Sequence, residues 1–260
     1  MNPAAARAPY EELPRGPLDD GHVEALWCYR SASSQPQWVL PDGRMDLVAH
    51  CLPTEDGALS GVWLALAGPC DVPGTMVARA GQISLGVRFR IGWGGACLRV
   101  DPAALRNRVL VGREVVRQTG IDADSILKAP TVPDLRDALV AAVRAASARA
   151  RPGAGHARAM AAIEVVQAAP PEARLQSAQD GVASRTLRRD VLAAAGLPLR
   201  CLAGIVRFQR AMRLLKAGDV DTLGALAFEA GFSDQAHMTR EFRRFGGFTP
   251  SLPREAPIVG

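Results

Sequence analysis

The sequence predicts an α+β protein: a small β-rich module, sandwich- or barrel-like, followed by helices and then by an all-α domain. Three observations lead to this prediction. Short apolar runs between Gly and Pro turn signals fill residues 21–100, as strands do. From residue 101, apolar residues recur at helical spacing. Residues 1–100 hold 8 basic and 10 acidic side chains, whereas residues 101–260 hold 23 basic and 16 acidic ones, so the helical half is the one that suits a polyanion.

The composition excludes several classes of protein. Hydrophobic residues make up 48% of the chain, which is too many for a generally disordered protein. No apolar run approaches the ~18 residues of a membrane span, and the N-terminus lacks the apolar core of a secretory signal. The five cysteines show no CxxC spacing, as expected of reduced thiols. A cytoplasmic protein with no membrane partner is therefore predicted.

The first hundred residues divide into two parts. Residues 1–20 are rich in Pro and charge, and are predicted to form a mobile arm. Residues 21–100 alternate strand-like runs with turns such as Pro41-Asp42-Gly43, where Pro presets φ, Asp caps the turn and Gly accepts positive φ. This alternation predicts a β-rich module that senses a ligand or presents a surface to a partner.

Residues 101–169 are predicted to be helical, beginning with the helix-start signal Asp101-Pro102 and interrupted at Pro152-Gly153. Two roles are open for these helices: they mediate dimerisation, or they pack on the β-rich module. Pro170-Pro171 ends the region, so a separate domain is predicted over residues 172–260.

The strongest pattern of that domain lies in residues 223–250. A first helix has one apolar face, Gly231 interrupts it, and Asp234 is placed to cap a second helix. The second helix carries apolar residues on one face and arginines on the other. A short helix, a glycine turn and a basic helix form a helix-turn-helix, whose second helix fits the major groove. An ordinary αα-hairpin is the alternative.

A weaker copy of this pattern lies 51 residues upstream. Four features recur at that constant offset: an apolar residue, an arginine two residues later, a second apolar residue and a glycine. The matching pairs are Leu187 and Met238, Arg189 and Arg240, Val191 and Phe242, Gly196 and Gly247, Leu197 and Phe248. The intervening stretch 199–216 is apolar on two sides, as a long helix between two packed units would be.

These residues resemble the DNA-binding domain of the AraC/XylS family of transcription regulators, over the last ~85 residues. The resemblance rests on Gly231-Phe232-Ser233, Thr239-Arg240-Glu241-Phe242, Gly247-Phe248-Thr249-Pro250 and the stretch Arg207 to Leu215. It implies two helix-turn-helix units joined by a long helix. Upstream, residues 41–47, 66–69 and 86–90 resemble an uncharacterised N-terminal module found before AraC-type domains in bacterial regulators.

The second helix of each unit then supplies the candidate DNA contacts. Arginine can donate to both acceptors of guanine, and glutamine can bond the acceptor and the donor of adenine, which discriminates by about 1–3 kcal/mol per contact. The candidate base readers are Arg185, Arg188 and Arg189 in the first unit, with Gln235, His237 and Arg240 in the second. Arg243 and Arg244 are expected to hold phosphates. For each arginine, a solvated surface charge is the alternative.

Asp42, Trp63 and Arg88 are the candidate effector-binding residues of the β-rich module, with packing of a small core as the alternative. We find no phosphate-binding loop, no nucleophile elbow and no clustered metal ligands, so no cofactor, metal site or catalytic residue is predicted.

The sequence therefore predicts a non-enzymatic transcription regulator that binds double-stranded DNA. Possible further partners are a small-molecule effector, a second copy of the chain in a homodimer and, for an activator, RNA polymerase. Two alternatives stay open: a constitutive DNA-binding protein whose N-terminal module only dimerises, and an enzyme acting on a small molecule with a DNA-binding appendage.

Overall fold

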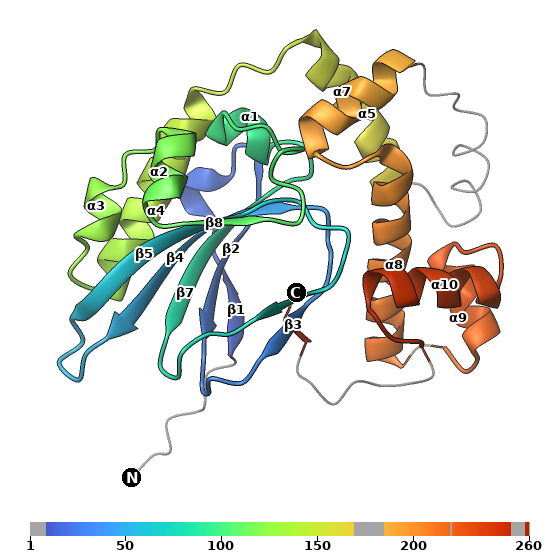
Figure 1. Ribbon diagram of the computed structural model, residues 1–260, viewed down its shortest axis with the longest axis horizontal. Coiled ribbons are helices and arrows are strands. Elements are labelled where there is room, and N and C mark those ends of the chain that lie inside the picture. The colour runs from blue at the N-terminus through green and yellow to red at the C-terminus, as the bar shows by residue number, and fades with distance from the viewer. Residues whose placement is uncertain (1–8, 169–184, 219, 251–257, 260) are drawn as a thin grey trace.

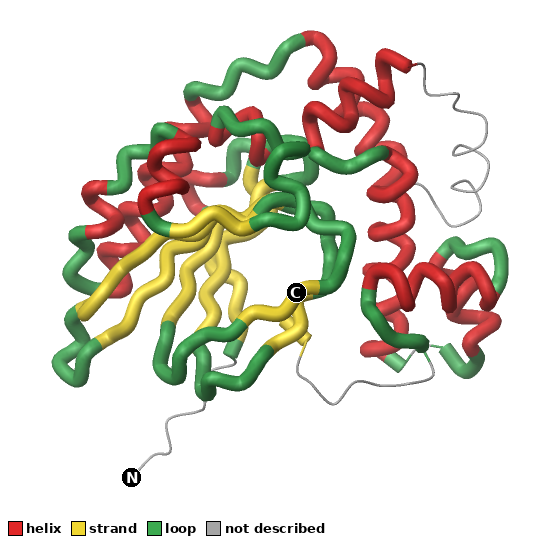
Figure 2. Tube along the Cα trace, viewed as in Figure 1, coloured by secondary structure: helices red, strands yellow, loops and turns green. Residues whose placement is uncertain are grey.

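A computed structural model describes residues 9–168, 185–218, 220–250 and 258–259. It confirms the α+β class, because a β-sheet with covering helices forms the first half of the chain and helices alone form most of the second (Figure 1, Figure 2). In the described part of the chain, no single helix is long and apolar enough for a membrane span. Only the pair α7 (Arg185–Ala195) and α8 (Leu199–Ala217), bent by 56°, reaches that length and composition together.

The main sheet has six antiparallel strands in the order β1-β2-β7-β4-β5-β8. Their bounds are Tyr10–Leu13 (β1), Val23–Arg30 (β2), Met45–Pro53 (β4), Leu59–Ala67 (β5), Ile83–Phe89 (β7) and Val109–Val111 (β8). A second sheet has the order β6-β3-β9, with β3 at Gln37–Val39, β6 at Gly74–Met76 and β9 at Ile258–Val259. Since β9 pairs with β3 in parallel, the C-terminal end of the chain reaches the N-terminal module (Figure 1).

Side chains alternate between the two faces of the main sheet. In β7, Leu85, Val87 and Phe89 are buried in the core beneath the helices, so Ser84 and Arg88 lie on the opposite face. The covering elements are η1 (Gly16–Leu18), α1 (Gly94–Leu98), α2 (Arg113–Thr119), α3 (Asp124–Leu127) and α4 (Val132–Ala148). Helix α4 begins at an N-cap, where the Thr131 hydroxyl accepts from the amide of Asp134, and its apolar face enters the same core.

The structure corrects the predicted arm and the predicted end of the β-rich module. Residues 10–18 are not a mobile arm, because Tyr10–Leu13 pairs along β2 and Leu18 is fully buried. Of the prolines in this segment, Pro14 stands between β1 and η1, and Pro17 lies within η1. The sheet also continues past residue 100: Val109–Val111 is an edge strand on β5, and no helix begins at Asp101-Pro102. A three-residue strand is too short to show a period in the sequence.

A second core lies among the remaining helices: α5 (Ala154–Ala168), α7 (Arg185–Ala195), α8 (Leu199–Ala217), α9 (Leu223–Ala230) and α10 (Gln235–Phe245). Ala159 and Ile163 of α5 are fully buried in this core together with Val191 and Phe208. The predicted boundary at Pro170-Pro171 therefore separates α5 from the helices on which it packs. Helices α2 to α4 pack on the sheet, which is the second of the two predicted roles for residues 101–169.

Candidate DNA interface

The second helix-turn-helix unit consists of α9, a four-residue turn and α10. The Thr222 hydroxyl caps α9, and Gly231 ends it at φ +87°, where the amide of Phe232 donates to the carbonyl of Ala227. The Asp234 carboxylate caps α10 by accepting from the amide of His237 at 2.6 Å. The glycine turn and the Asp cap were both predicted, because each is a local signal.

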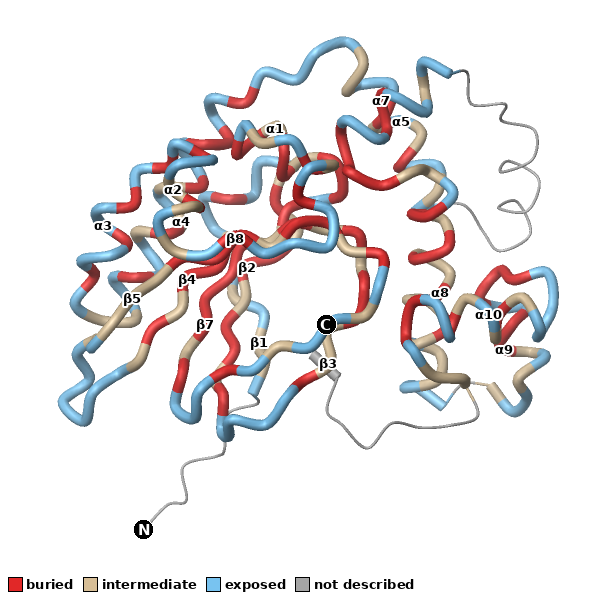
Figure 3. Tube along the Cα trace, viewed as in Figure 1, coloured by how far each residue is buried: buried red, intermediate tan, exposed pale blue. Residues whose placement is uncertain are grey.

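Helix α10 has a buried face and an exposed face. Met238, Phe242 and Phe245 are fully buried, and the ring of Phe242 meets that of Phe208 on α8 edge-on at 5.0 Å. On the other face Gln235, Arg240 and Arg243 are exposed and line a shallow open hollow with Ala236 and Thr239. Because the aromatic face is buried, the polar and basic side chains lie on the solvent side. Buried and exposed positions accordingly alternate along α10 (Figure 3).

His237 lies at the edge between these two faces. Its Nδ1 is 3.1 Å from the hydroxyl of Ser233, and its ring meets that of Phe232 edge-on at 5.5 Å. Partial burial, followed by the positive charge of Arg207, lowers the pKa of His237. The side chain is thus held neutral against the turn, apart from the exposed row of Gln235, Arg240 and Arg243.

Helix α7 corresponds to α10 at the predicted offset. Val191 is fully buried as Phe242 is, and Gly196 and Gly247 have φ angles of +71° and +72°. Arg185, Arg188 and Arg189 are exposed, and 75% of the side-chain surface of Arg189 is accessible to solvent. The residues that precede α7, 169–184, lie outside the described residues, so the structure describes only the second helix of the predicted first unit.

Helix α8 is the rigid link between the two units. Its 19 residues make it roughly 28 Å long, and it contacts both α7 and α10 (Figure 1). Gly204 lets α10 approach closely, because a Cβ there would lie 2.4 Å from Glu241 Oε2 and 3.0 Å from the ring of Phe245. The two arginine-bearing helices are therefore held by one continuous helix, with their cationic side chains outside.

Two family models match the chain. Residues 177–256 match a helix-turn-helix domain, and residues 10–111 match a domain of unknown function, DUF6597. The C-terminal domain is an AraC-type helix-turn-helix domain. The chain is accordingly a DNA-binding transcription regulator, with a DUF6597 domain in front of its AraC-type domain.

No curated protein matches the chain. Among solved structures, an apo ToxT variant from Vibrio cholerae strain SCE256 is 12% identical with a TM-score of 0.39, covering 87% of this chain and 95% of that one. ToxT from V. cholerae O395 bound to (E)-4-(8-methylnaphthalen-1-yl)but-3-enoic acid is 10% identical with a TM-score of 0.38, covering 86% and 95%. Both TM-scores lie below 0.5, so we conclude nothing about this chain from them.

Arg244 of the AraC-type domain leaves the exposed row of α10. Its Nη2 lies 3.4 Å from Asp71 Oδ2 of the DUF6597 domain and 3.5 Å from the sulfur of Cys201. Its guanidinium lies over the ring of Phe245, 4.8 Å from the ring centre. The arginines predicted to hold phosphates are thus divided, since Arg243 points to solvent and Arg244 toward the N-terminal module.

Two of the three predicted effector residues come together in the DUF6597 domain. Arg88 Nε lies 3.6 Å from Asp42 Oδ2 and 3.3 Å from Asp46 Oδ1, and it has no hydrogen-bond partner. Trp27 Nε1 donates to Asp46 at 2.7 Å. Burial raises the pKa of Asp46 to about 6, against the opposing charge of Arg88.

Trp63 lies further along the same face of the sheet and stacks on His50 at 5.3 Å. Sequence reasoning missed Trp27, whose ring lies so close to Gly86 that a Cβ there would be 2.1 Å from it. The available signal was a glycine within a strand, which often marks a close approach.

The Asp42 turn also touches the AraC-type domain. The carbonyl of Pro41 accepts a hydrogen bond from Gln209 Nε2 of α8 at 2.7 Å. A Cβ at Gly43 would lie 3.0 Å from the side chain of Leu202, also on α8. The turn that carries Asp42 is therefore in direct contact with α8.

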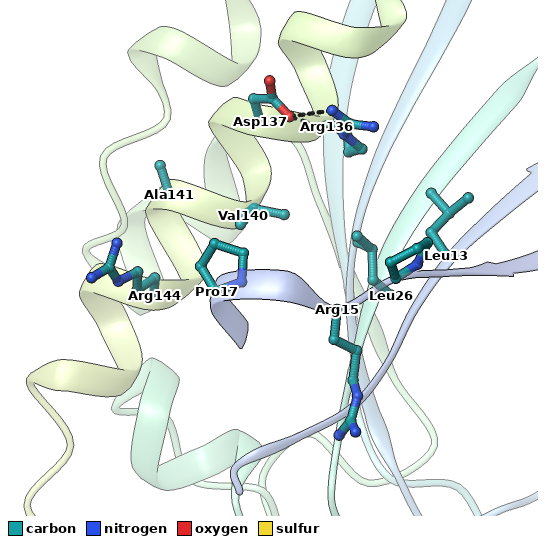
Figure 4. Close-up of a pocket in the computed structure, with 10 residues that line it drawn as sticks. Leu13, Arg15, Pro17, Leu26, Arg136, Asp137, Val140, Ala141 and Arg144 are labelled. Carbon is teal, nitrogen blue, oxygen red and sulfur yellow. Dashed lines mark hydrogen bonds and ion pairs between the residues drawn. The ribbon is translucent and has the colours of Figure 1, made fainter. Parts of the chain in front are cut away.

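Two surface hollows in the described part of the chain lie away from Asp42, Trp63 and Arg88. One is the shallow surface on α10. The other lies between η1 and α4 and is lined by Leu13, Pro17 and Val140, with Arg136 and Arg144 at its rim (Figure 4). Neither is lined by Asp42, Trp63 or Arg88. Within the described residues, no group of three His, Cys, Asp or Glu side chains is placed to hold a metal ion.

Proposed function

We propose that this chain is a sequence-specific regulator that reads two successive major-groove segments of one DNA duplex with α7 and α10. The observation that carries this proposal is the pair of arginine-bearing helices on α8, whose length of roughly 28 Å is close to the ~34 Å repeat of the duplex. As a bacterial regulator it would act in the cytoplasm, where its double-stranded DNA lies.

The exposed side chains have separate proposed roles. Gln235 and Arg240 contact base edges from α10, and Arg185, Arg188 and Arg189 do so from α7. Arg243 holds a phosphate. His237 is proposed to fix the turn that orients α10, and any base contact it makes would be secondary to that.

The experiment that tests this function is genomic footprinting of the purified chain, followed by titration of the recovered operator with Arg240→Ala. We expect the variant to lose about 1–3 kcal/mol of discrimination at one base position. The matched control is Arg149→Ala, an exposed arginine on the loop between α4 and α5. Equal affinity of Arg240→Ala and the unsubstituted chain for every operator variant would contradict the assignment.

We further propose that the DUF6597 domain controls DNA binding through a small-molecule effector at Asp42 and Arg88, with Trp63 further along the same face. Arg88 Nε supports this, since it has ion pairs but no hydrogen-bond partner, and an acceptor on the ligand would supply one. The contacts of Pro41 and Gly43 with α8 provide the route to the AraC-type domain. A ligand screen by thermal shift, repeated on Arg88→Gln, tests it: hits should lose their shift in the variant.

A constitutive regulator whose N-terminal module only dimerises is the second candidate. It is favoured by the position of the two hollows, neither of which includes the predicted effector residues. Sedimentation of the DNA-free chain decides whether a homodimer forms, and transcription in vitro with RNA polymerase decides between an activator and a repressor. The enzyme alternative would require turnover of a hit from the ligand screen.

A further inference from the structure

Asp71 is a buried carboxylate at the junction of the DUF6597 and AraC-type domains, with 4% of its side chain exposed. Arg106 donates to both of its oxygens, at 3.0 and 2.5 Å, and Asn107 Nδ2 donates to Oδ1 at 2.9 Å. Asn107 also accepts from the backbone amide of Asp71 at 3.0 Å. The side chain is thus held in place by a loop of its own domain.

The AraC-type domain approaches the same carboxylate from the other side. The thiol of Cys201, in the first turn of α8, lies 3.6 Å from Oδ2, and Arg244 of α10 lies 3.4 Å from that same oxygen. Burial alone would raise the pKa of Asp71, but hydrogen bonds from Arg106 and Asn107 lower it to about 2. A fixed negative charge therefore faces one arginine of the second DNA-reading helix.

We propose that Asp71 competes with a DNA phosphate for Arg244, so that the N-terminal domain restrains DNA binding by holding α10. Carboxylate and phosphate are both acceptors that match the fork of a guanidinium. Arg244 keeps 48% of its side-chain surface and belongs to the helix that carries Arg240 and Arg243, so it can exchange one acceptor for the other. This inference rests on the proposed DNA-binding function.

The size of the effect follows from linkage. A contact that is made only in the DNA-free arrangement must be broken when DNA binds. The free energy of DNA binding therefore becomes less favourable by the free energy of that contact. Since Arg244 is half exposed, its pairing with Asp71 is that of a surface ion pair, and we expect its loss to change affinity by about two- to fivefold.

The test uses the full chain and a double-mutant cycle on the recovered operator. Asp71→Asn should tighten binding by about two- to fivefold, because Arg244 then loses the buried carboxylate that competes with a phosphate, and keeps only its longer ion pair with Glu241 at 3.9 Å. Arg244→Gln should weaken binding, and Asp71→Asn should have no further effect in that background. An unchanged or lowered affinity of Asp71→Asn, or the same gain with and without Arg244, would overturn the proposal.

Arg106→Gln is the matched control, because it loosens Asp71 within its own domain but leaves Arg244 paired. If it tightens DNA binding as much as Asp71→Asn does, the effect comes from a disturbed N-terminal domain and the competition is wrong. We expect Arg106→Gln to leave the affinity unchanged or to lower it, because Arg244 is then the remaining cation at Asp71 Oδ2.

Hydrogen exchange of the DNA-free chain separates this inference from the proposed function. Asp71→Asn and Arg244→Gln should both speed exchange in residues 199–205 and 235–245, whereas Arg243→Gln should not. If the chain binds no DNA sequence, the proposed function and the competition fall together, while the exchange rates still decide whether Asp71 holds the two domains. Unchanged exchange in both variants would overturn the Asp71 contact itself.

Discussion

Arg243 and Arg244 are neighbours with the same chemistry, yet the fold gives them different surroundings. Arg243 is exposed beside Arg240, whereas Arg244 reaches Asp71 of the other domain. Successive residues of a helix point about 100° apart, so the buried face of α10 decides the direction of each side chain. The local sequence shows that both arginines lie outside the core, but not which one has a partner.

Arg243→Ala tests the difference in DNA binding at this scale. We expect affinity to fall almost equally for operator and unrelated DNA, with the salt slope reduced by about 1, because a phosphate contact carries no sequence information. Binding titrations at several salt concentrations measure both quantities. A loss confined to the operator would make Arg243 a base reader instead.

Asp46 predicts a pH dependence of stability. Its pKa in the folded chain is raised to about 6 from 3.8, first by burial, so the protonated form is favoured in the fold. Its stabilising contribution is therefore fully present below about pH 4 and is lost as the pH rises through about 6. Relative to Asp46→Asn, the unsubstituted chain should lose on the order of 1–2 kcal/mol across this range.

Urea unfolding of both proteins at a series of pH values measures that difference. Burial lowers the pKa of His50 to about 4, so His50 titrates in the same window with the opposite sign. Because His50 is present in both proteins, its contribution cancels in the comparison. A pH-independent difference between the two proteins would contradict the raised pKa.

At the scale of elements, the two arginine-bearing helices α7 and α10 share one pattern of buried and exposed positions with different side chains. Val191 occupies in α7 the fully buried place that Phe242 occupies in α10, and a left-handed glycine follows each helix. The repeat was recognisable because caps, glycines and apolar spacing are local signals. In the sequence, Gly204 was recognisable only as a residue of low helix propensity within a long helix. The structure explains the glycine, because α10 approaches α8 too closely there for a side chain.

Gly204→Val tests that approach. The added side chain meets the buried ring of Phe245, so we expect a loss of about 1–3 kcal/mol in unfolding free energy and weaker operator binding. Gly224→Ala is the control: the nearest atom to its Cβ is 3.9 Å away, so it should stabilise α9 by up to about 1 kcal/mol. Equal stability of Gly204→Val and the unsubstituted chain would show that α8 and α10 pack less closely than described.

At the scale of the whole molecule, helix α5 belongs with the AraC-type domain. Ala159 and Ile163 are buried among α7 and α8, and Arg158 forms an ion pair at 2.7 Å with Asp190, which is 7% exposed. The prolines after α5 suggested a domain boundary. Prolines end a helix, however, and the helix before them can still pack on the helices that follow.

A fragment of residues 150–260 should therefore unfold cooperatively and be more stable than a fragment of residues 172–260, by at least about 2 kcal/mol. The shorter fragment loses two core side chains and leaves the Asp190 carboxylate without Arg158. Thermal unfolding followed by circular dichroism measures this. Identical transitions in the two fragments would place α5 with the N-terminal domain or with neither.

The sequence by itself determined the α+β class, the helix-turn-helix of residues 223–250 with its repeat, and the exposure of most candidate DNA contacts. Each depends on apolar period, caps and glycines within a few residues of one another. Only the tertiary structure decided that β1 and β8 join the sheet, that α5 joins the second core, and that Arg244 pairs with Asp71, 173 positions away. The physical reason is that such contacts are selected by the packing of distant surfaces, which leaves no local pattern in the chain.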